Sequence, residues 1–247
     1  FIGVLLLGAG AVTMRELIND RLRFPVQVED KGLEIIAVTP RLNRRQHQQI
    51  LAGEEEERGE QGSRTALFSE AMRRVVNLTA PDKAERSVAL LLASNAAGDG
   101  VSTTAFGLAR TVARSGRKAL VVETDLTAQQ ADTDRPGLAK VLAGEAPLDE
   151  ALVRIAADET SAFWVLPSTW DRSHPTELLA SPRMDSLMAA LRERFDVILL
   201  DATPVTQSAD AEVLAPHCDG TVLVMRYGTS QKLIRSSLDL LDRVTNN

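Results

Sequence analysis

The stretch at residues 94–104, which reads SNAAGDGVSTT, constrains the fold of this chain more than any other segment. It follows an apolar run at 88–92 and precedes a pattern of helical spacing at 105–114. A strand, a glycine-bearing turn and a helix in that order form a cradle for an anion, because the N–H groups of the turn and the positive end of the helix dipole converge there. The sequence therefore predicts a phosphate-binding loop.

This loop departs from the standard pattern at its most important charge. In G-x-x-x-x-G-K-[ST], the lysine reaches the β- and γ-phosphates and the hydroxyl holds Mg²⁺. Gly100 and Ser102 stand where the pattern requires them, whereas Val101 occupies the lysine position. The loop has the pattern of a nucleotide site that lacks its main cation.

Composition indicates one large α/β domain or a domain with appendages, since the chain has 247 residues of which 44% are apolar and 25% charged. The net charge of −6 argues against general nucleic-acid affinity, so we expect no nucleic-acid partner. The single cysteine, Cys218, rules out an internal disulfide framework and is interpreted as a turn thiol. The three histidines have no partner at metal-ligand spacing.

Apolar segments alternate with helical patterns from residue 86 onward. Strands that are apolar throughout and separated by helices predict a mostly parallel sheet covered by helices on both faces. We expect strands at 88–93, 119–123, 163–166, 197–200 and 221–225, and helices at 103–115, 137–143, 148–156, 183–194, 208–215 and 231–243.

The chain before residue 86 is less regular. Apolar spacing predicts helices at 12–22 and 65–78 and a short strand at 33–38. The polar, charged stretch at 42–62 is interpreted as a solvated linker.

Residues 1–12 are apolar and uncharged, and they allow two interpretations. As a helix they would cover about 18 Å, which is short of the roughly 20 residues that a bilayer span needs. Followed by Arg15 and Arg21, they fit the cytoplasmic end of a transmembrane helix. Gly8 and Gly10 equally match two of the three glycines of a dinucleotide fingerprint, so the residues alone leave both interpretations open.

Carboxylates follow two of the predicted strands. Glu123 and Asp125 come after one of them, and Asp201 comes after another. Ligands of such sheets bind at the carboxyl ends of the strands, and Mg²⁺ takes one or two carboxylates with phosphate oxygens and waters. Each aspartate alone is explained by capping of the next turn. The loop and both acidic strand ends together favour a nucleotide site.

Two basic residues are candidates for the missing charge. Lys118 precedes its strand and is expected at the opposite, amino edge of the sheet. Arg135, in the segment after Asp125, is the better candidate by position.

Residues 86–230 resemble the cytoplasmic ATPase domain of bacterial tyrosine autokinases, which are associated with membrane polysaccharide co-polymerases that control exopolysaccharide or capsule chain length. The resemblance also covers 12–42, which look like the segment after the family's second transmembrane helix. It implies a P-loop NTPase-like fold preceded by a membrane-proximal helical segment. The motifs that carry it are the loop at 94–104, VVETDL at 121–126, and the stretches at 136–152, 174–205 and 219–230.

The resemblance implies three parts of the chain. Residues 1–13 would be the end of a transmembrane helix, 14–64 a juxtamembrane segment and linker, and 65–247 the kinase-like cytoplasmic domain. The chain would then belong to the bacterial inner membrane, with this part in the cytoplasm.

The resemblance also implies roles for individual residues. Asp125 matches the second of two aspartates that serve Mg²⁺ and the tyrosine substrate, and Glu123 stands where the first is usually Asp. Asp201 matches the distal Mg²⁺-associated aspartate. Glu70 and Arg73 match the E-x-x-R-x-x-R oligomerisation motif. The implied catalytic residues are Asp125 and Asp201, the metal ligands Ser102, Asp125 and Asp201, and the cofactor-binding residues Gly98, Asp99, Gly100, Val101, Ser102 and Thr103.

Three departures from the family's pattern bear on activity. Val101 replaces the catalytic lysine, and Ala96 stands where related ATPases carry a signature lysine. Val76 stands at the last Arg of the oligomerisation motif, with Arg74 close by. Tyr227 is the single tyrosine among these 247 residues, none of which matches the family's tyrosine-rich tail.

These departures shape the function that the resemblance implies. We expect a kinase-like domain of a polysaccharide co-polymerase that regulates chain length or export. Its binding of ATP or ADP with Mg²⁺, or its catalysis, is expected to be weakened or lost, because a charge-assisted bond contributes roughly 1.5–3 kcal/mol. The transition state of phosphoryl transfer carries more charge than bound ATP, so it should lose more stabilisation when the lysine is absent.

Partners and alternatives complete the expectation. The implied partners are further copies of the chain, the membrane, polysaccharide polymerase or export components, and a separate kinase or phosphatase. One alternative is an active tyrosine autokinase of the same pathway that uses another cation. A partitioning-type ATPase is another, opposed by the missing signature lysine.

Overall fold

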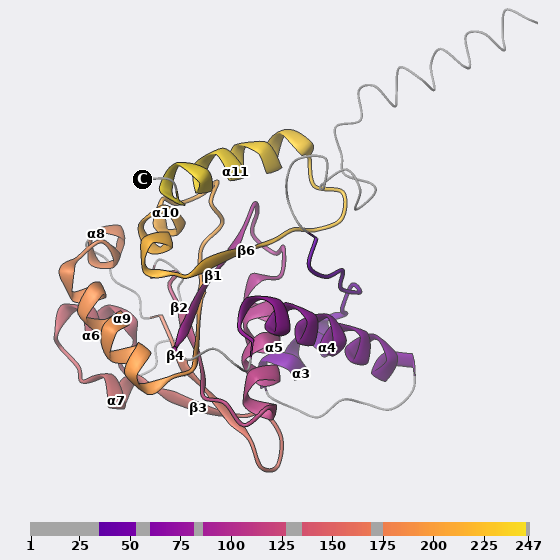
Figure 1. Cartoon of the computed structure of the whole chain (residues 1–247), viewed down its shortest axis with the longest axis horizontal. Coiled ribbons are helices and arrows are strands. Elements are labelled where there is room, and N and C mark those ends of the chain that lie inside the picture. The colour runs from indigo at the N-terminus through magenta and orange to yellow at the C-terminus, as the bar shows by residue number, and fades with distance from the viewer. Residues whose placement is uncertain (1–34, 53–59, 82–85, 127–134, 169–174, 246–247) are drawn as a thin grey trace, which may run out of the picture.

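A six-stranded sheet organises the part of the chain that the computed structural model describes, which is residues 35–52, 60–81, 86–126, 135–168 and 175–245. The strand order is β3-β4-β2-β5-β1-β6, and every pairing is parallel except that of β3 with β4 at one edge. Figure 1 shows the sheet between two groups of helices. The strands are β1 (Val88–Ser94), β2 (Ala119–Glu123), β3 (Val153–Ala156), β4 (Ala162–Leu166), β5 (Val197–Asp201) and β6 (Gly220–Val224).

Helices cover both faces of this sheet, as the sequence predicts. Helices α3, α4 and α5 pack on one face, and α6, α8, α9 and α10 pack on the other. The helices are α3 (Arg44–Ala52), α4 (Glu60–Thr79), α5 (Val101–Arg114), α6 (Leu138–Ala143), α7 (Leu148–Ala151), α8 (Pro175–Leu179), α9 (Pro182–Arg194), α10 (Asp210–Leu214), the 3₁₀ turn η1 (Ala215–His217) and α11 (Gln231–Thr245).

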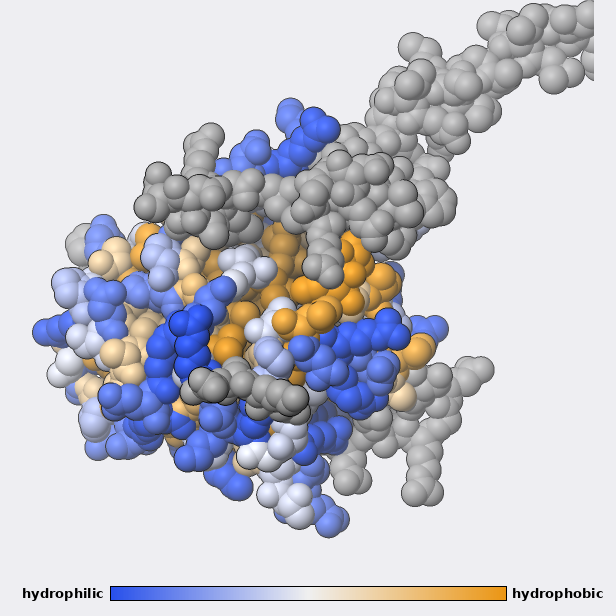
Figure 2. All heavy atoms as spheres, viewed as in Figure 1, coloured by the Kyte–Doolittle hydropathy of each residue, from blue (hydrophilic) through white to orange (hydrophobic). Residues whose placement is uncertain are grey.

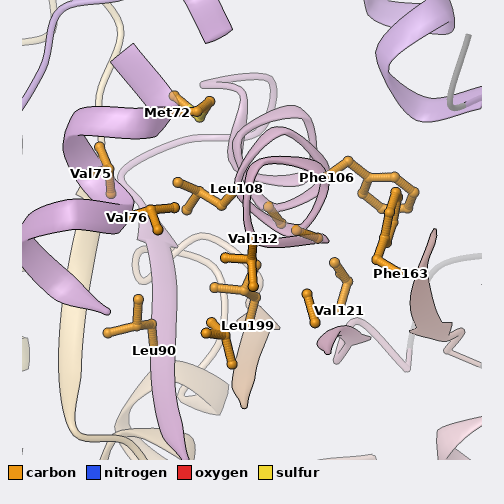
Figure 3. Packing of buried hydrophobic residues seen from close by; sticks show 14 of the residues in the cluster. Met72, Val75, Val76, Leu90, Phe106, Leu108, Val112, Val121, Phe163 and Leu199 are labelled. Carbon is orange, nitrogen blue, oxygen red and sulfur yellow. The ribbon is translucent and has the colours of Figure 1, made fainter. Parts of the chain in front are cut away.

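Successive residues of the central strands supply two separate cores, because side chains alternate across a sheet. Leu90 of β1 packs with α4 and α5, whereas its neighbour Leu91 packs with α6, α9 and α10. Figure 3 shows the first of these cores, where Met72 and Val76 of α4 face Leu108 and Val112 of α5. In Figure 2, hydrophilic side chains cover much of the visible surface and apolar ones show between them. The α/β fold with a mostly parallel sheet is confirmed.

A glycine sets how closely α4 approaches α5. A Cβ atom on Gly107 would lie 2.6 Å from Cε1 of Phe68 and 3.0 Å from Cγ of Met72. Real Cβ atoms essentially never come within 3.0 Å of another atom, so a side chain at position 107 would force the ring of Phe68, or the helix that carries it, to shift. Helix α4 is thereby packed tightly against the helix that begins at the phosphate loop.

The prediction of one helix over 148–156 is wrong. The chain forms the single turn α7 and then the edge strand β3. Val153 and Ile155 are partly buried, while Arg154 and Ala156 are exposed. This alternation is typical of a strand with one face on the core, and a helix would not keep it.

The prediction of a solvated linker over 42–62 is wrong for residues 44–52, which form α3, and for residues 60–62, which begin α4. Asn43 and Gln46 exchange hydrogen bonds between side chain and backbone, each 2.9 Å long, and so close a capping box at the start of this helix. Ile50 is buried and belongs to the same core as the apolar residues of α4 and α5. Residues 35–38, which were expected to continue a strand from residue 33, have no regular secondary structure.

Several predictions for the first residues lie outside the described part of the chain. They include the helix at 12–22, the end of a transmembrane helix and the two glycines of the dinucleotide pattern. None of the helices in the described part combines the length and the apolar character that a membrane span requires. The domain boundaries at 13 and 64 stay predictions.

Candidate functional site

The predicted site residues converge on one cavity of about 580 Å³ at the carboxyl ends of β1, β2 and β5. All of the residues that the sequence assigns to cofactor, metal or catalysis contribute to its wall. Parallel strands bring their carboxyl ends to one edge of the sheet, which is where ligands of such folds bind. The cavity is formed by residues that are far apart in the sequence and become neighbours through strand order.

The phosphate loop has the backbone conformation that its glycines allow. Gly98 and Gly100 have φ angles of +81° and +103°, in the left-handed region that favours glycine. Inside the loop, the carboxylate of Asp99 accepts a hydrogen bond of 3.1 Å from the N–H of Ala96. The guanidinium of Arg226, just after β6, donates to the carbonyl of Gly98. The loop is therefore held in shape by its own residues and by the neighbouring strand.

Helix α5 begins at the end of the loop and points its amino terminus at the cavity. The N–H of Thr104 donates to the carbonyl of Gly100 at 2.9 Å. The earlier N–H groups of the first turn have no acceptor within the helix, and no acidic side chain stands in that turn. This arrangement favours an anion.

The position that a lysine usually holds is apolar here. Val101 is 8% exposed, and its side chain packs into the core with α4 and α5 while also forming part of the cavity wall. The Val101 side chain supplies dispersion contacts and no charge. The backbone cradle is present without the loop's cation.

Asn95 is a buried polar residue in the loop that sequence reasoning missed. Its side chain is fully buried, and neither its amide nitrogen nor its amide oxygen has a hydrogen-bond partner among the described residues. Its backbone carbonyl accepts a hydrogen bond of 2.6 Å from the hydroxyl of Thr206. An unpaired buried amide costs about 1–3 kcal/mol. The side chain of Asn95 therefore lowers the stability of the loop.

Carboxylates form the opposite wall. Glu123 and Asp201 are direct partners in the register of β2 and β5. Burial raises the pKa of Asp201 to about 7; the charges of Glu123 and Asp125 add to this, and a hydrogen bond from Ser102 opposes it. A carboxylate in this situation ionises readily once a cation is present.

These oxygens suit a magnesium ion that arrives with a nucleotide. Ser102 already bonds to Asp201, and Asp125 lies in the same cavity. In the described ranges, no three His, Cys, Asp or Glu side chains are grouped closely enough to hold a metal by themselves. Mg²⁺ normally completes its shell with phosphate oxygens and waters, so the donor set fits Mg²⁺ together with a phosphate.

Helix α3 forms a third wall that the sequence did not predict. Arg44 and His47 both border the cavity, and Nδ1 of His47 lies 2.5 Å from Oγ1 of Thr103. Deeper in the fold, the guanidinium of Arg110 donates to the carbonyls of Gln49 and Ile50 at 3.3 and 2.8 Å. The polar composition of this segment concealed the helix. The reciprocal pair Asn43 and Gln46 was the local signal for it.

The two basic candidates of the sequence lie elsewhere. The backbone N–H of Lys118 donates to Asp196 at 2.7 Å beside the amino end of β2, which agrees with its predicted place at the opposite edge. Arg135 is exposed and does not belong to the described residues that line the cavity. Neither residue stands where the missing lysine would act.

Glu70 and Arg73 form an exposed pair on α4. Nε and Nη2 of Arg73 both donate to one carboxylate oxygen of Glu70, at 2.9 and 2.6 Å, and both side chains are about half exposed. Val76, at the motif's last Arg position, is buried in the core, whereas Arg74 is exposed. The pair is on the surface, away from the cavity.

Comparison of the sequence with known proteins finds bacterial tyrosine kinases. The tyrosine-protein kinase YwqD of Bacillus subtilis is 30% identical over 175 residues, which are 68% of this chain and 72% of that protein. The succinoglycan biosynthesis transport protein ExoP of Rhizobium meliloti is 31% identical over 158 residues, 60% of this chain and 20% of that protein. The tyrosine-protein kinase wzc of Salmonella typhi is 26% identical over 97% of this chain, but the match spans 35% of that protein. No family model matches the chain.

Comparison of the structure gives the same fold. The kinase domain of the Escherichia coli tyrosine kinase ETK matches with a TM-score of 0.73 and 21% identity, over 89% of this chain and 88% of that one. The BceF tyrosine kinase domain matches with a TM-score of 0.71 and 22% identity, over 91% and 94%. A more distant likeness, with a TM-score of 0.54 and 19% identity over 65% and 68%, is to cobyrinic acid a,c-diamide synthase of Mycobacterium smegmatis, solved with bound ADP and magnesium.

Proposed function

The chain belongs to the family of bacterial tyrosine-protein kinases, and we propose that it is a kinase-like domain with weakened or lost nucleotide binding or catalysis. In this proposal it regulates exopolysaccharide or capsule chain length or export as part of a membrane polysaccharide co-polymerase. The likeness to a succinoglycan biosynthesis transport protein supports the pathway. The observation that carries the proposal is Val101, an apolar residue packed into the core where the loop's cation should stand.

The loss of one cation affects binding less than catalysis. A charge-assisted hydrogen bond contributes roughly 1.5–3 kcal/mol to binding. Its absence should therefore lower the affinity for ATP by about ten- to a hundredfold. Backbone N–H groups of the loop and the start of α5 still favour phosphate. Phosphoryl transfer depends on neutralising the charge that develops in the transition state, where the missing cation matters more.

A second candidate function is an active tyrosine autokinase. Ser102, Asp125 and Asp201 favour it, because these groups suit Mg²⁺ and would have no use in a cavity without a nucleotide. The catalytic cation would then come from outside the loop.

The proposed surroundings of the domain follow the family. The chain would reside at the bacterial inner membrane through its first residues and act in the cytoplasm. Its partners would be polymerase or export components and a separate kinase or phosphatase. Glu70 and Arg73 would join copies of the chain, which their exposure on α4 permits. The net charge of −6 supports the expectation of no nucleic-acid partner.

Calorimetric titration of Mg-ATP and Mg-ADP into the full chain tests the proposal, beside the variant Val101→Lys. We expect the variant to bind about ten- to a hundredfold more tightly than the native chain. Val38→Lys, which adds the same charge at a position that is 71% exposed, should leave affinity unchanged.

Two outcomes would contradict the proposal. Robust ATP-dependent phosphorylation of a supplied tyrosine peptide by the native chain would replace it with the active kinase. Absence of nucleotide binding even by Val101→Lys would show that the cavity does not receive nucleotides.

A further inference from the structure

The cavity carries a deficit of positive charge that a nucleotide would have to overcome. Glu123, Asp125 and Asp201 line one side, Asp99 belongs to the loop, and Val101 contributes no cation. A polyphosphate adds several negative charges of its own. Among the described residues that line the cavity, Arg44 is the single Lys or Arg.

Arg44 is free to act on a ligand. It is the first residue of α3, and the capping bonds between Asn43 and Gln46 fix where that helix begins. Its side chain is exposed and makes no hydrogen bond or ion pair with another described residue. A guanidinium presents a planar fork of donors that matches phosphate oxygens in pairs.

Two contacts on α5 fix the direction of α3. His47 contacts Thr103 at the start of α5, and the carbonyl of Ile50 accepts a hydrogen bond from Arg110, about two turns further along that helix. The order of the contacts is the same on both helices, so α3 and α5 run in the same general direction. The amino-terminal end of α3, where Arg44 stands, therefore lies at the phosphate-loop end of α5.

We propose that α3 is the cationic wall of the nucleotide site and that Arg44 binds the nucleotide's phosphates in place of the absent loop lysine. His47 is a positioning residue, because its contact with Thr103 holds the first turn of α3 against the loop. The proposal rests on the proposed function, in that it requires the cavity to receive a nucleotide. It assigns the cation to a segment outside the phosphate loop, 57 positions before Val101.

The variants Arg44→Ala and Arg41→Ala test the role of the guanidinium in the full chain. Arg41 is also exposed and does not line the cavity, so it controls for a general loss of charge. We expect Arg44→Ala to lower the affinity for Mg-ATP by about tenfold or more. The affinity of Arg41→Ala should stay within about twofold of that of the native chain. Arg44→Lys should recover part of the affinity that Arg44→Ala loses. Adenosine, which has no phosphate, should bind the native chain and Arg44→Ala equally.

Repeating these titrations in the Val101→Lys background separates two kinds of failure. Equal affinities for Mg-ATP with and without Arg44 in both backgrounds would overturn the role of Arg44 and leave the nucleotide cavity standing. Tighter binding by Arg44→Ala would overturn it too, because α3 would then obstruct the site. No binding in either background would overturn the proposed function and this inference together.

A double-mutant comparison tests His47. A positioning role predicts that His47→Ala weakens Mg-ATP binding in the native chain and has no further effect when Arg44 is already Ala. A purely structural role predicts the same loss in both backgrounds, and that result would remove His47 from the proposal.

Discussion

The acidic wall of the cavity and the wall formed by α3 are held in place in different ways. The acidic wall consists of Glu123 and Asp201, at the ends of two central strands that pair in register and are buried on both faces. The cationic wall is α3, a nine-residue helix on the outside of α5 that brings Arg44 to the cavity and is held there by the contact of His47 with Thr103. The register of the sheet fixes the positions of Glu123 and Asp201, whereas a few polar contacts between α3 and α5 fix the position of Arg44.

The sheet alone fixes the acidic wall, whereas the position of the cationic wall depends on how α3 docks on α5. Any chain that forms β2 and β5 in this register brings residues 123 and 201 together. Position 44 reaches the cavity because Thr103 and Arg110 of α5 hold α3 in place. A loss of charge within the loop is therefore open to compensation from an outer element without any change to the sheet.

The largest expected effect concerns the acidic wall and pH. Burial raises the pKa of Asp201 from 3.8 to about 7. Between these values the folded chain keeps a proton that the unfolded chain releases, so stability falls as pH rises from about 4 to about 7 and then levels off. The difference between the two pKa values corresponds to at most about 4 kcal/mol.

Urea unfolding without nucleotide or metal at pH 5, 6, 7 and 8 would measure this dependence. Asp201→Asn should lose this part of the pH dependence and be the more stable chain above pH 7. If the native chain instead gained stability relative to the variant over this range, the acidic wall would be stabilised in its ionised form.

The next effect concerns metal binding by the same wall. Asp201→Asn removes the negative charge that we assign to Mg²⁺, and we expect Mg-ADP to bind about ten- to a hundredfold more weakly. Binding of ADP in EDTA should not weaken, because the backbone cradle and α3 are untouched and one charge that repels the phosphates is removed. Asp239→Asn, on the exposed side of α11, is the matched control. An unaltered magnesium dependence would remove Asp201 from the set of ligands.

Removing the contact between Arg110 and α3 should loosen the cationic wall without loosening the sheet. Arg110→Met keeps a long apolar stem but removes the donors to the carbonyls of Gln49 and Ile50, which should cost about 2 kcal/mol of unfolding free energy. Hydrogen exchange should accelerate in α3 and remain slow in β2 and β5.

Arg114→Met is the control for this experiment. Arg114 stands one turn later on the same helix and forms a partly exposed ion pair with Asp158, so its loss should destabilise the chain far less than the loss of Arg110. Equal acceleration of exchange in the sheet and in α3 would show that the two walls are not independent.

The smallest effect is expected outside both walls. Glu70→Gln breaks an exposed pair within α4, and such pairs contribute about 0.3–0.5 kcal/mol. The unfolding midpoint should hardly move, whereas sedimentation should show weaker self-association if the pair joins copies of the chain. A large loss of stability would mean that the pair serves the domain itself.

The acidic wall could be predicted from the sequence because its strands are fully buried. Strands β1, β2 and β5 are apolar up to their last residue, and their predicted ends lie within one residue of the observed ones. A carboxylate directly after such a run is conspicuous. The structure places β5 between β1 and β2. The expectation that Glu123 and Asp201 lie close together did not depend on this order, because the carboxyl ends of parallel strands meet at one edge of the sheet.

The edge strand and the cationic wall could not be predicted in the same way. Strand β3 has four residues, follows a single helical turn without a glycine or proline between them, and buries one face only. Helix α3 reads RRQHQQILA, with Ile50 as its main buried apolar side chain. Nothing local to Arg44 or His47 reveals that they meet the loop, because that depends on how α3 docks on α5.

The close approach of α4 and α5 at Gly107 has a consequence for how such chains diverge. Because a Cβ atom at position 107 would overlap the ring of Phe68, the two positions are not free to vary one at a time. A related chain with alanine at position 107 should carry a smaller side chain at position 68. Paired substitutions at these two positions would then be a record, readable from sequences alone, of which relatives keep the two helices in contact.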